Sequence, residues 1–73
     1  MITIDALGLS CPLPVVRTMA AMAAHPAEEI VVHVDNEAAK ENVTRLAQAK
    51  GYTVDIVRDQ LTYRLTLHPA VHA

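Results

Sequence analysis

Apolar and polar residues alternate along residues 2–6 and 61–67, which is the two-residue period of a β-strand with one buried face. Residues 30–35 and 52–58 are two further predicted strands. Only Asp59-Gln60 separates the third strand from the fourth, so these two strands are expected to pair as an antiparallel hairpin. The loop contains no glycine, and the pattern therefore leaves the register of the hairpin open.

Two stretches between the strands, of which the first covers residues 13–24, carry apolar residues at helical spacing. The apolar face of the first helix is expected to consist of Val15, Met19, Met22 and Ala23. His25 and Pro26 end this helix, because proline disfavours a helical conformation in the residue before it. Asn36 is expected to cap the second helix and Gly51 to end it. The apolar face of the second helix is expected to consist of Ala39, Val43, Leu46 and Ala47.

The element order βαβαββ predicts an α/β fold of the α+β two-layer sandwich type, in a single domain of residues 1–73. A right-handed crossover makes the first two strands parallel, so the four-stranded sheet is mixed, with two helices on one face. The strand residues expected to face the helices are Ile30, Val32, Val34, Leu61, Tyr63, Leu65 and Leu67. The open face is expected to carry Val31, His33, Asp35 and Val57.

The composition fits a compact globule and excludes several classes of function. Of the 73 residues, 52% are hydrophobic and 19% charged, with a net charge of −2 and a pI near 6.0. This charge gives no basic field for a phosphate backbone, and 3% aromatic residues give no platform for stacking bases, so no direct nucleic-acid binding is expected. No apolar run approaches ~20 residues, and the strand-like start lacks the features of a signal peptide. No membrane insertion is expected, and a cytoplasmic location is predicted.

The single cysteine, Cys11, stands between the first strand and the first helix. It is predicted to be the N-cap of that helix, with Pro12 at the first helical position and Pro14 at the third. The two prolines stiffen the turn and leave the N–H of Leu13 as the nearby donor. This donor and the positive end of the helix dipole are expected to favour the thiolate, the reactive form of cysteine. A lone cysteine is more often a small buried hydrophobe, but the position between Ser10 and two prolines argues for chemistry.

Charged residues near the same edge of the sheet are candidates for guiding a partner. Both helices of a parallel βαβ unit begin at the carboxyl ends of the strands, so Cys11 and the turn at residues 35–37 are expected to share one edge. Arg17 and Lys40 lie within the first two turns of their helices and are candidates for guiding an anionic donor or partner. For these two residues and for Asp35, surface charge or helix capping is an equally good explanation.

Residues 5–18, Asp-Ala-Leu-Gly-Leu-Ser-Cys-Pro-Leu-Pro-Val-Val-Arg-Thr, resemble the TusA/SirA-like family of sulfur carrier proteins. The mark of this family is a Cys-Pro-x-Pro turn after the first strand, and the resemblance covers nearly the whole chain. Residues 34–45 with Gly51-Tyr52 look like the N-terminal domain of YedF-type proteins linked to selenium metabolism. One departure concerns residues 19–22, Met-Ala-Ala-Met, where many members of the family carry lysines. The basic patch for an acidic partner is therefore weaker.

The resemblance implies that Cys11 holds sulfane sulfur as a persulfide. The implied donor is a cysteine desulfurase or an inorganic source of sulfane sulfur, and the implied acceptor is a thiol of a partner protein. The resemblance carries over Pro12 and Pro14 as residues that shape the turn, and Arg17 as the basic residue on the same helix. No cofactor is expected.

Two other kinds of chemistry are disfavoured by the residues. A disulfide oxidoreductase normally carries a Cys-x-x-Cys pair, and this chain has one cysteine. The histidines are scattered along the chain, at His25, His33, His68 and His72. Residues 68–72 are predicted to be a frayed tail, so no metal site is expected.

A non-catalytic interaction or regulatory module is the main alternative from another class. Such a module would dock a partner through the open sheet face or through the surface around Met19 and Met22, although methionines at helical spacing are more often core. A selenium carrier would differ from a sulfur carrier only in its donor. The sequence also leaves open whether the protein is a monomer or a weak dimer.

Overall fold

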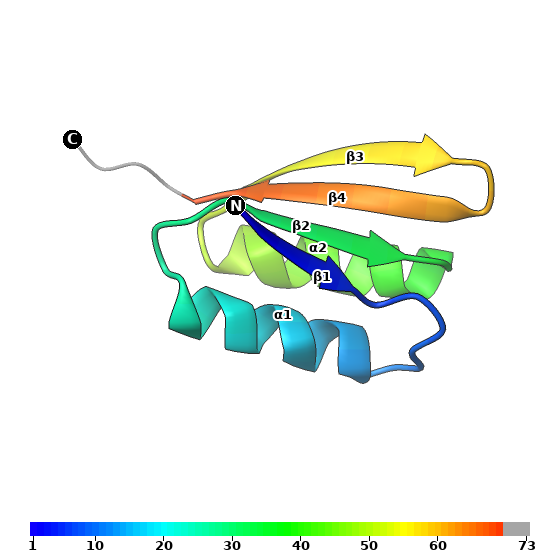
Figure 1. The fold of residues 1–73 in the computed structure, drawn as a ribbon, viewed down its shortest axis with the longest axis horizontal. Coiled ribbons are helices and arrows are strands. Elements are labelled where there is room, and N and C mark those ends of the chain that lie inside the picture. Colours follow the sequence, from blue (N-terminus) through cyan, green and yellow to red (C-terminus); the bar gives the residue numbers. More distant parts are fainter. Residues whose placement is uncertain (70–73) are drawn as a thin grey trace.

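The structure of the protein is a computed structural model that describes residues 1–69. Its four strands form one sheet in the order β1-β2-β4-β3 (Figure 1). The strands are β1 (Ile2–Asp5), β2 (Ile30–Val34), β3 (Thr53–Asp59) and β4 (Thr62–His68). β1 and β2 are parallel, and β4 is antiparallel to both β2 and β3. The predicted strand order along the chain, the parallel first pair and the final hairpin are confirmed.

Both helices, α1 (Leu13–Ala24) and α2 (Glu37–Ala49), lie on the same face of the sheet (Figure 1). α1 is the crossover between β1 and β2, and α2 leads from β2 to the outer strand β3. This arrangement confirms the predicted α+β two-layer sandwich with a four-stranded mixed sheet.

The core lies between the sheet and the helices, and the central strand β2 supplies much of it. The fully buried apolar residues are Ile30, Val32 and Val34 of β2, Leu65 and Leu67 of β4, and Val43 and Ala47 of α2. Burying each valine, leucine or isoleucine side chain stabilises the fold by about 1.5–3 kcal/mol. These residues confirm the predicted inward faces of both strands and of the second helix, where Ala39 is also buried and Leu46 partly so.

The buried face of α1 shares only Met22 with the predicted face. The residues it buries are Pro14, Thr18 and Met22, whereas Met19 is 46% exposed and Ala23 is also exposed. A polar residue can occupy this face because the Thr18 hydroxyl donates to the carbonyl of Pro14 at 2.8 Å, which satisfies it within the helix. Apolarity alone therefore assigned Met19 and Ala23 to the core and missed Thr18, and the assignment of Met19 and Ala23 is wrong.

Both predicted ends of α2 are confirmed. The side-chain oxygen of Asn36 accepts a hydrogen bond from the N–H of Ala39 at 2.8 Å, which makes Asn36 the N-cap. At the other end, Gly51 has φ +86°, and the N–H of Tyr52 donates to the carbonyl of Ala47 at 2.9 Å. This is a Schellman turn, which requires a left-handed residue and therefore favours glycine.

The open face of the sheet is less exposed at its centre than expected. Val31 is only 7% exposed, whereas Val57 on the outer strand β3 is 45% exposed. Val31 lies on β2, between its register partners Thr3 on β1 and Thr66 on β4. Because both neighbouring strands place a side chain beside it, the expectation that Val31 is exposed is wrong.

The hairpin loop lies one residue later than predicted. Asp59 is the last residue of β3 and pairs with Thr62, so the loop consists of Gln60 and Leu61. Leu61 is 83% exposed, and its predicted place in the core is wrong. Gln60 has φ +56°, because a two-residue hairpin loop needs a left-handed residue and this loop has no glycine.

His68 was expected in a frayed tail and is instead the last residue of β4. Its Nδ1 lies 2.9 Å from Oε2 of Glu29, and its Nε2 lies 2.8 Å from Oδ2 of Asp55. These contacts connect the end of β4 to the residue that precedes β2 and to β3. The predicted tail beyond residue 69, with His72, lies outside the described residues.

Candidate functional site

Cys11 belongs to the connection from β1 to α1. This connection lies at the edge of the sheet where β1 and β2 end (Figure 1). This connection is fastened to the end of β2, because the N–H of Gly8 donates to Oδ2 of Asp35 at 2.7 Å. A second bond, from the N–H of Leu7 to Oδ1 of Asp5 at 3.0 Å, closes the turn after β1. The predicted meeting of the thiol-bearing loop and the turn after β2 is thereby confirmed.

The N-cap of α1 is Pro12, and the expectation that Cys11 caps the helix is wrong. The carbonyl of Pro12 accepts the first helical hydrogen bond, from the N–H of Val16 at 3.0 Å. Leu13 is therefore the first helical residue, where Pro12 was predicted. Pro14 is the second helical residue, whereas it was predicted to be the third. The Cys11–Pro12 peptide bond is cis.

The backbone donor predicted beside the thiol is also used elsewhere. The N–H of Leu13 donates to the carbonyl of Ser10 at 2.9 Å, which closes a turn around Cys11 and Pro12 before the helix begins. This turn replaces the expected N–H contact to sulfur. The group that does approach the sulfur is the side chain of Asn42 on α2, whose Nδ2 lies 3.9 Å from Sγ of Cys11 and donates to it.

Cys11 is exposed as a residue, and its side chain borders a small recess between the start of α1 and the first half of α2. The recess has a volume of about 20 Å³, room for about one water-sized atom. The residues that line it are Cys11, Pro12, Pro14, Val15, Asn36, Ala39 and Asn42. Both prolines predicted to shape the turn are among them, and Pro14 is buried whereas Pro12 is exposed.

Asn42 is the residue of this recess that the sequence analysis missed. It lies three residues after Ala39 and directly before Val43, both of which are buried on α2. A partly buried polar residue inside a helix face of this kind is a signal, because a polar group there requires a partner. Prediction from the sequence considered only the apolar positions of this helix face, Ala39 and Val43, and therefore did not select Asn42.

The three charged candidates have different surroundings. Arg17 is exposed, and within residues 1–69 it forms no ion pair. Lys40 is not part of the recess, since its ammonium group lies 3.3 Å from Oε1 of Glu37 and 5.1 Å from the centre of the Tyr63 ring. Asp35 holds the loop through Gly8. Of the two cations, Arg17 is therefore the one that forms no ion pair within residues 1–69.

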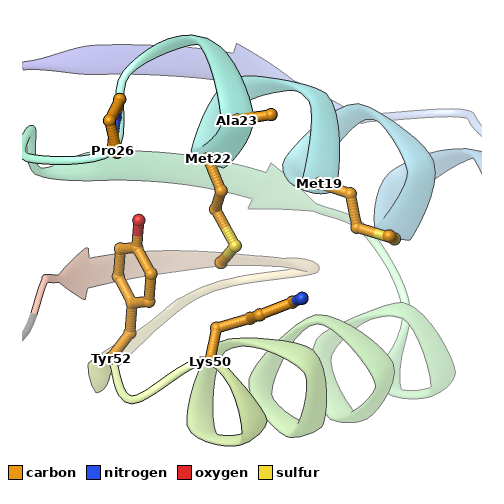
Figure 2. Close-up of a pocket in the computed structure, with 6 residues that line it drawn as sticks. All are labelled: Met19, Met22, Ala23, Pro26, Lys50 and Tyr52. Atoms are coloured by element: carbon orange, nitrogen blue, oxygen red, sulfur yellow. The ribbon is translucent and has the colours of Figure 1, made fainter.

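A larger hollow lies near the other end of the two helices (Figure 2). It has a volume of about 400 Å³ and is lined by Met19, Met22, Ala23, Pro26, Lys50 and Tyr52. Figure 2 shows the Met22 side chain pointing from α1 toward Lys50 and Tyr52. None of its lining residues is shared with the Cys11 recess, and none is a cysteine, a histidine or a carboxylate. Size alone therefore does not identify the reactive site.

Two further searches concern metals and membranes. Within residues 1–69, no three histidine, cysteine, aspartate or glutamate side chains come close enough together to hold a metal ion. None of the helices in that same part of the chain has the length and apolarity needed to span a bilayer.

Comparison with known protein sequences matches this chain to one family and to proteins of two organisms. The model of the family "Sulfurtransferase TusA" matches residues 2–68. The chain is 38% identical over 50 residues to "Putative sulfur carrier protein YrkI" of Bacillus subtilis, an alignment covering 67% of each protein. It is 37% identical over 57 residues to "Putative sulfur carrier protein MJ0990" of Methanocaldococcus jannaschii, covering 77% of this chain and 76% of that protein.

A solved structure agrees with these sequence matches. The crystal structure of a SirA-like protein from Desulfitobacterium hafniense superimposes with a TM-score of 0.84 at 37% sequence identity. The superposition covers 92% of this chain and 95% of the other. None of these relatives is named as a YedF-type protein, so that closer likeness stays a prediction.

Proposed function

Because the chain belongs to the TusA sulfurtransferase family, we propose that Cys11 carries sulfane sulfur as a persulfide and passes it to a partner protein. The observation that carries this proposal is the setting of the thiol. Cys11 is the only cysteine, it is exposed, and its sulfur borders a recess with room for about one further atom. A partner thiol can therefore reach a sulfur that the fold holds in one place.

The proposed chemistry consists of two exchange steps, each of which conserves atoms and charge. In the first, the Cys11 thiolate attacks the outer sulfur of a donor persulfide. A new S–S bond forms, the donor S–S bond breaks, and the donor leaves as a thiolate with the electron pair. In the second, an acceptor thiolate attacks the outer sulfur of the Cys11 persulfide, and the Cys11 thiolate leaves. No net oxidation or reduction occurs.

The lone cysteine suits a carrier better than a redox enzyme. Within one chain there is no second thiol to attack the loaded Cys11 and release the sulfur as sulfide. The persulfide therefore waits for an external acceptor. We place this relay in the cytoplasm, where an exposed unpaired thiol stays reduced, with a cysteine desulfurase or inorganic sulfane sulfur as donor.

The roles of the surrounding residues follow from their positions. Pro12 and Pro14 line the recess and fix the loop that carries the thiol. Arg17 lies on the same helix, exposed and without an ion pair within residues 1–69, so we assign it the guidance of an anionic donor or partner. A donor that supplied selenium would react at the same residues. The resemblance to YedF-type proteins therefore leaves a selenium carrier as an alternative.

The decisive experiment is intact mass spectrometry after incubation with inorganic polysulfide, or with a cysteine desulfurase and cysteine. A carrier gains the mass of one sulfur atom, and dithiothreitol removes it. The Cys11→Ser variant gains nothing. If the wild-type protein gains no sulfur from any of these donors, the carrier function is refuted.

An interaction module is the second candidate, favoured by apolar residues left exposed on one side of α1. These residues are Leu13, Val16 and Met19. An isolated exposed apolar side chain is ordinary, but three within two turns of a helix form a surface that a partner can cover. Binding that Cys11→Ser leaves unchanged, in a protein that takes up no sulfur, would favour this reading.

A further inference from the structure

The two amide side chains of the Cys11 recess differ in what they contact. Asn36 accepts from the N–H of Ala39 at 2.8 Å and donates to Oδ1 of Asp35 at 3.1 Å, so it is occupied in capping α2. Within residues 1–69, the only hydrogen bond of the Asn42 side chain is the one to Sγ of Cys11, at 3.9 Å. That separation is long even for a sulfur acceptor, so the amide has capacity for a nearer one.

We propose that the recess is the seat of the outer persulfide sulfur and that Asn42 is the positioning residue that holds it through an N–H···S hydrogen bond. This proposal rests on the carrier function and specifies how its loaded form is kept. A persulfide extends the Cys11 side chain by one atom, about 2.05 Å beyond Sγ. The recess of about 20 Å³ takes one atom of roughly water size, and it lies beside that sulfur.

The walls of the recess suit a polarisable, partly charged atom that has to be kept from water. Four of its lining residues are apolar, namely Pro12, Pro14, Val15 and Ala39. Asn42 adds a neutral donor, and a hydrogen bond to an ionised acceptor is about twice as strong as one to a neutral acceptor. An ionised outer sulfur is therefore stabilised without a full positive charge beside it. The walls of the recess would also slow the attack of small reductants on the outer sulfur. An acceptor protein would have to approach this sulfur at the edge of the sheet.

The test compares variants that keep the shape of Asn42 and change its hydrogen bonding. Asn42→Leu has the same branching without a donor, and Asn42→Asp replaces the donor with a negatively charged acceptor. Asn42→Gln restores an amide on a side chain one methylene longer. Gln48→Leu, on the exposed surface of the same helix, is the matched control for loss of an amide. Thermal unfolding by circular dichroism identifies any variant that does not fold.

Each protein is loaded with inorganic polysulfide, freed of excess donor and challenged with dithiothreitol, and the persulfide is followed by intact mass. In Asn42→Leu the lifetime of the persulfide is expected to fall about tenfold, the effect of losing one hydrogen bond to a charged group. Asn42→Asp is expected to load to a lower level, since its carboxylate repels an ionised outer sulfur. Asn42→Gln is expected to recover part of the lifetime, and Gln48→Leu to match the wild type.

The failures of the two proposals are distinguishable. If the wild-type protein gains no sulfur, the carrier function and this inference both fall. If all folded variants load fully and lose sulfur at the wild-type rate, the carrier function stands and the role of Asn42 is refuted. If Gln48→Leu shortens the lifetime as much as Asn42→Leu, the effect is not specific to the recess and the role is also refuted.

Discussion

The carboxylate of Asp35, at the end of β2, accepts a hydrogen bond from the backbone N–H of Gly8 at 2.7 Å. The two residues are far apart in the sequence, and this contact joins the turn before α2 to the loop that carries Cys11. The other carboxylate oxygen accepts from the side chain of Asn36 at 3.1 Å. Asp35 therefore connects the N-cap of one helix to the loop leading into the other, which a carboxylate can do because it accepts from several donors.

Removing this connection is expected to loosen the site more than the fold. For Asp35→Ala we expect a loss of about 1 kcal/mol in the free energy of unfolding, since a charge-assisted hydrogen bond is lost at an exposed position. We also expect a shorter persulfide lifetime, because the loop at Gly8 is no longer fixed. Urea denaturation and intact mass measure the two effects. Asp59→Ala is the control, because Asp59 lies at the same end of the sheet on the outer strand β3, and within residues 1–69 its carboxylate forms no hydrogen bond to the thiol-bearing loop. An equal change in persulfide lifetime in both variants would contradict the proposed connection.

Gly8 makes a second, purely backbone contribution to the same loop. Its φ is +74°, and a Cβ added to it would meet no atom within 4 Å. Gly8→Ala is therefore expected to cost about 1–2 kcal/mol of stability through the left-handed conformation alone, without a clash. Gly51→Ala, at φ +86°, carries the same kind of strain at the end of α2.

These two glycine variants separate stability from loading. Both are expected to melt at a lower temperature, by similar amounts. Only Gly8→Ala is expected to slow sulfur uptake from polysulfide, because only Gly8 lies in the thiol-bearing loop. Equal uptake by the two variants at a temperature where both are folded would show that the geometry of this loop is not important for loading.

The sequence predicts the architecture well because the element order and the strand alternation both depend on local patterns. β2 shows this, since every second residue from Ile30 is fully buried. The N-cap of α2 is equally local, as the Asn36 side chain bonds a backbone group three residues away. Its failures on burial have two causes, namely side chains contributed from elsewhere in the chain and local hydrogen bonds that an apolar pattern does not record. Val31 is covered by two flanking strands, and Thr18 is accepted in the core because its hydroxyl has a backbone partner.

The site was predictable to a similar extent. Cys11 could be chosen from the sequence because a single cysteine beside two prolines at a helix start is unusual. Its contact with Asn42 joins the loop before α1 to a residue in the middle of α2, and neither local pattern contains that information. The sequence predicted the N–H of Leu13 as the donor to the sulfur, with the helix beginning at Pro12. The helix begins one residue later, and the N–H of Leu13 instead donates to the carbonyl of Ser10.

Arg17 offers a test of electrostatic guidance. We expect Arg17→Glu to slow loading from polysulfide, an anionic donor, several-fold at low ionic strength, and to have little effect at high salt because the field is screened. Stability should change little, since Arg17 is exposed and forms no ion pair within residues 1–69. Arg64→Glu is the control, because Arg64 is exposed on the sheet face that the helices leave uncovered. Loading rates that respond equally to both variants would indicate an effect of net charge alone.

Two threonine hydroxyls, one on each helix, are buried, but only one of them has a hydrogen-bond partner in the described part of the chain. Replacing each threonine with valine is therefore expected to change the free energy of unfolding in opposite directions. The hydroxyl of Thr44 on α2 is buried and has no hydrogen-bond partner within residues 1–69, whereas that of Thr18 on α1 donates to Pro14. An unsatisfied buried polar group costs about 1–3 kcal/mol, and valine removes it with nearly the same shape. Thr44→Val is therefore expected to raise the free energy of unfolding by about 1 kcal/mol, and Thr18→Val to lower it by about 1 kcal/mol. Urea denaturation of both variants provides the measurement, and a loss of stability in Thr44→Val as large as in Thr18→Val would mean that the Thr44 hydroxyl is satisfied in solution.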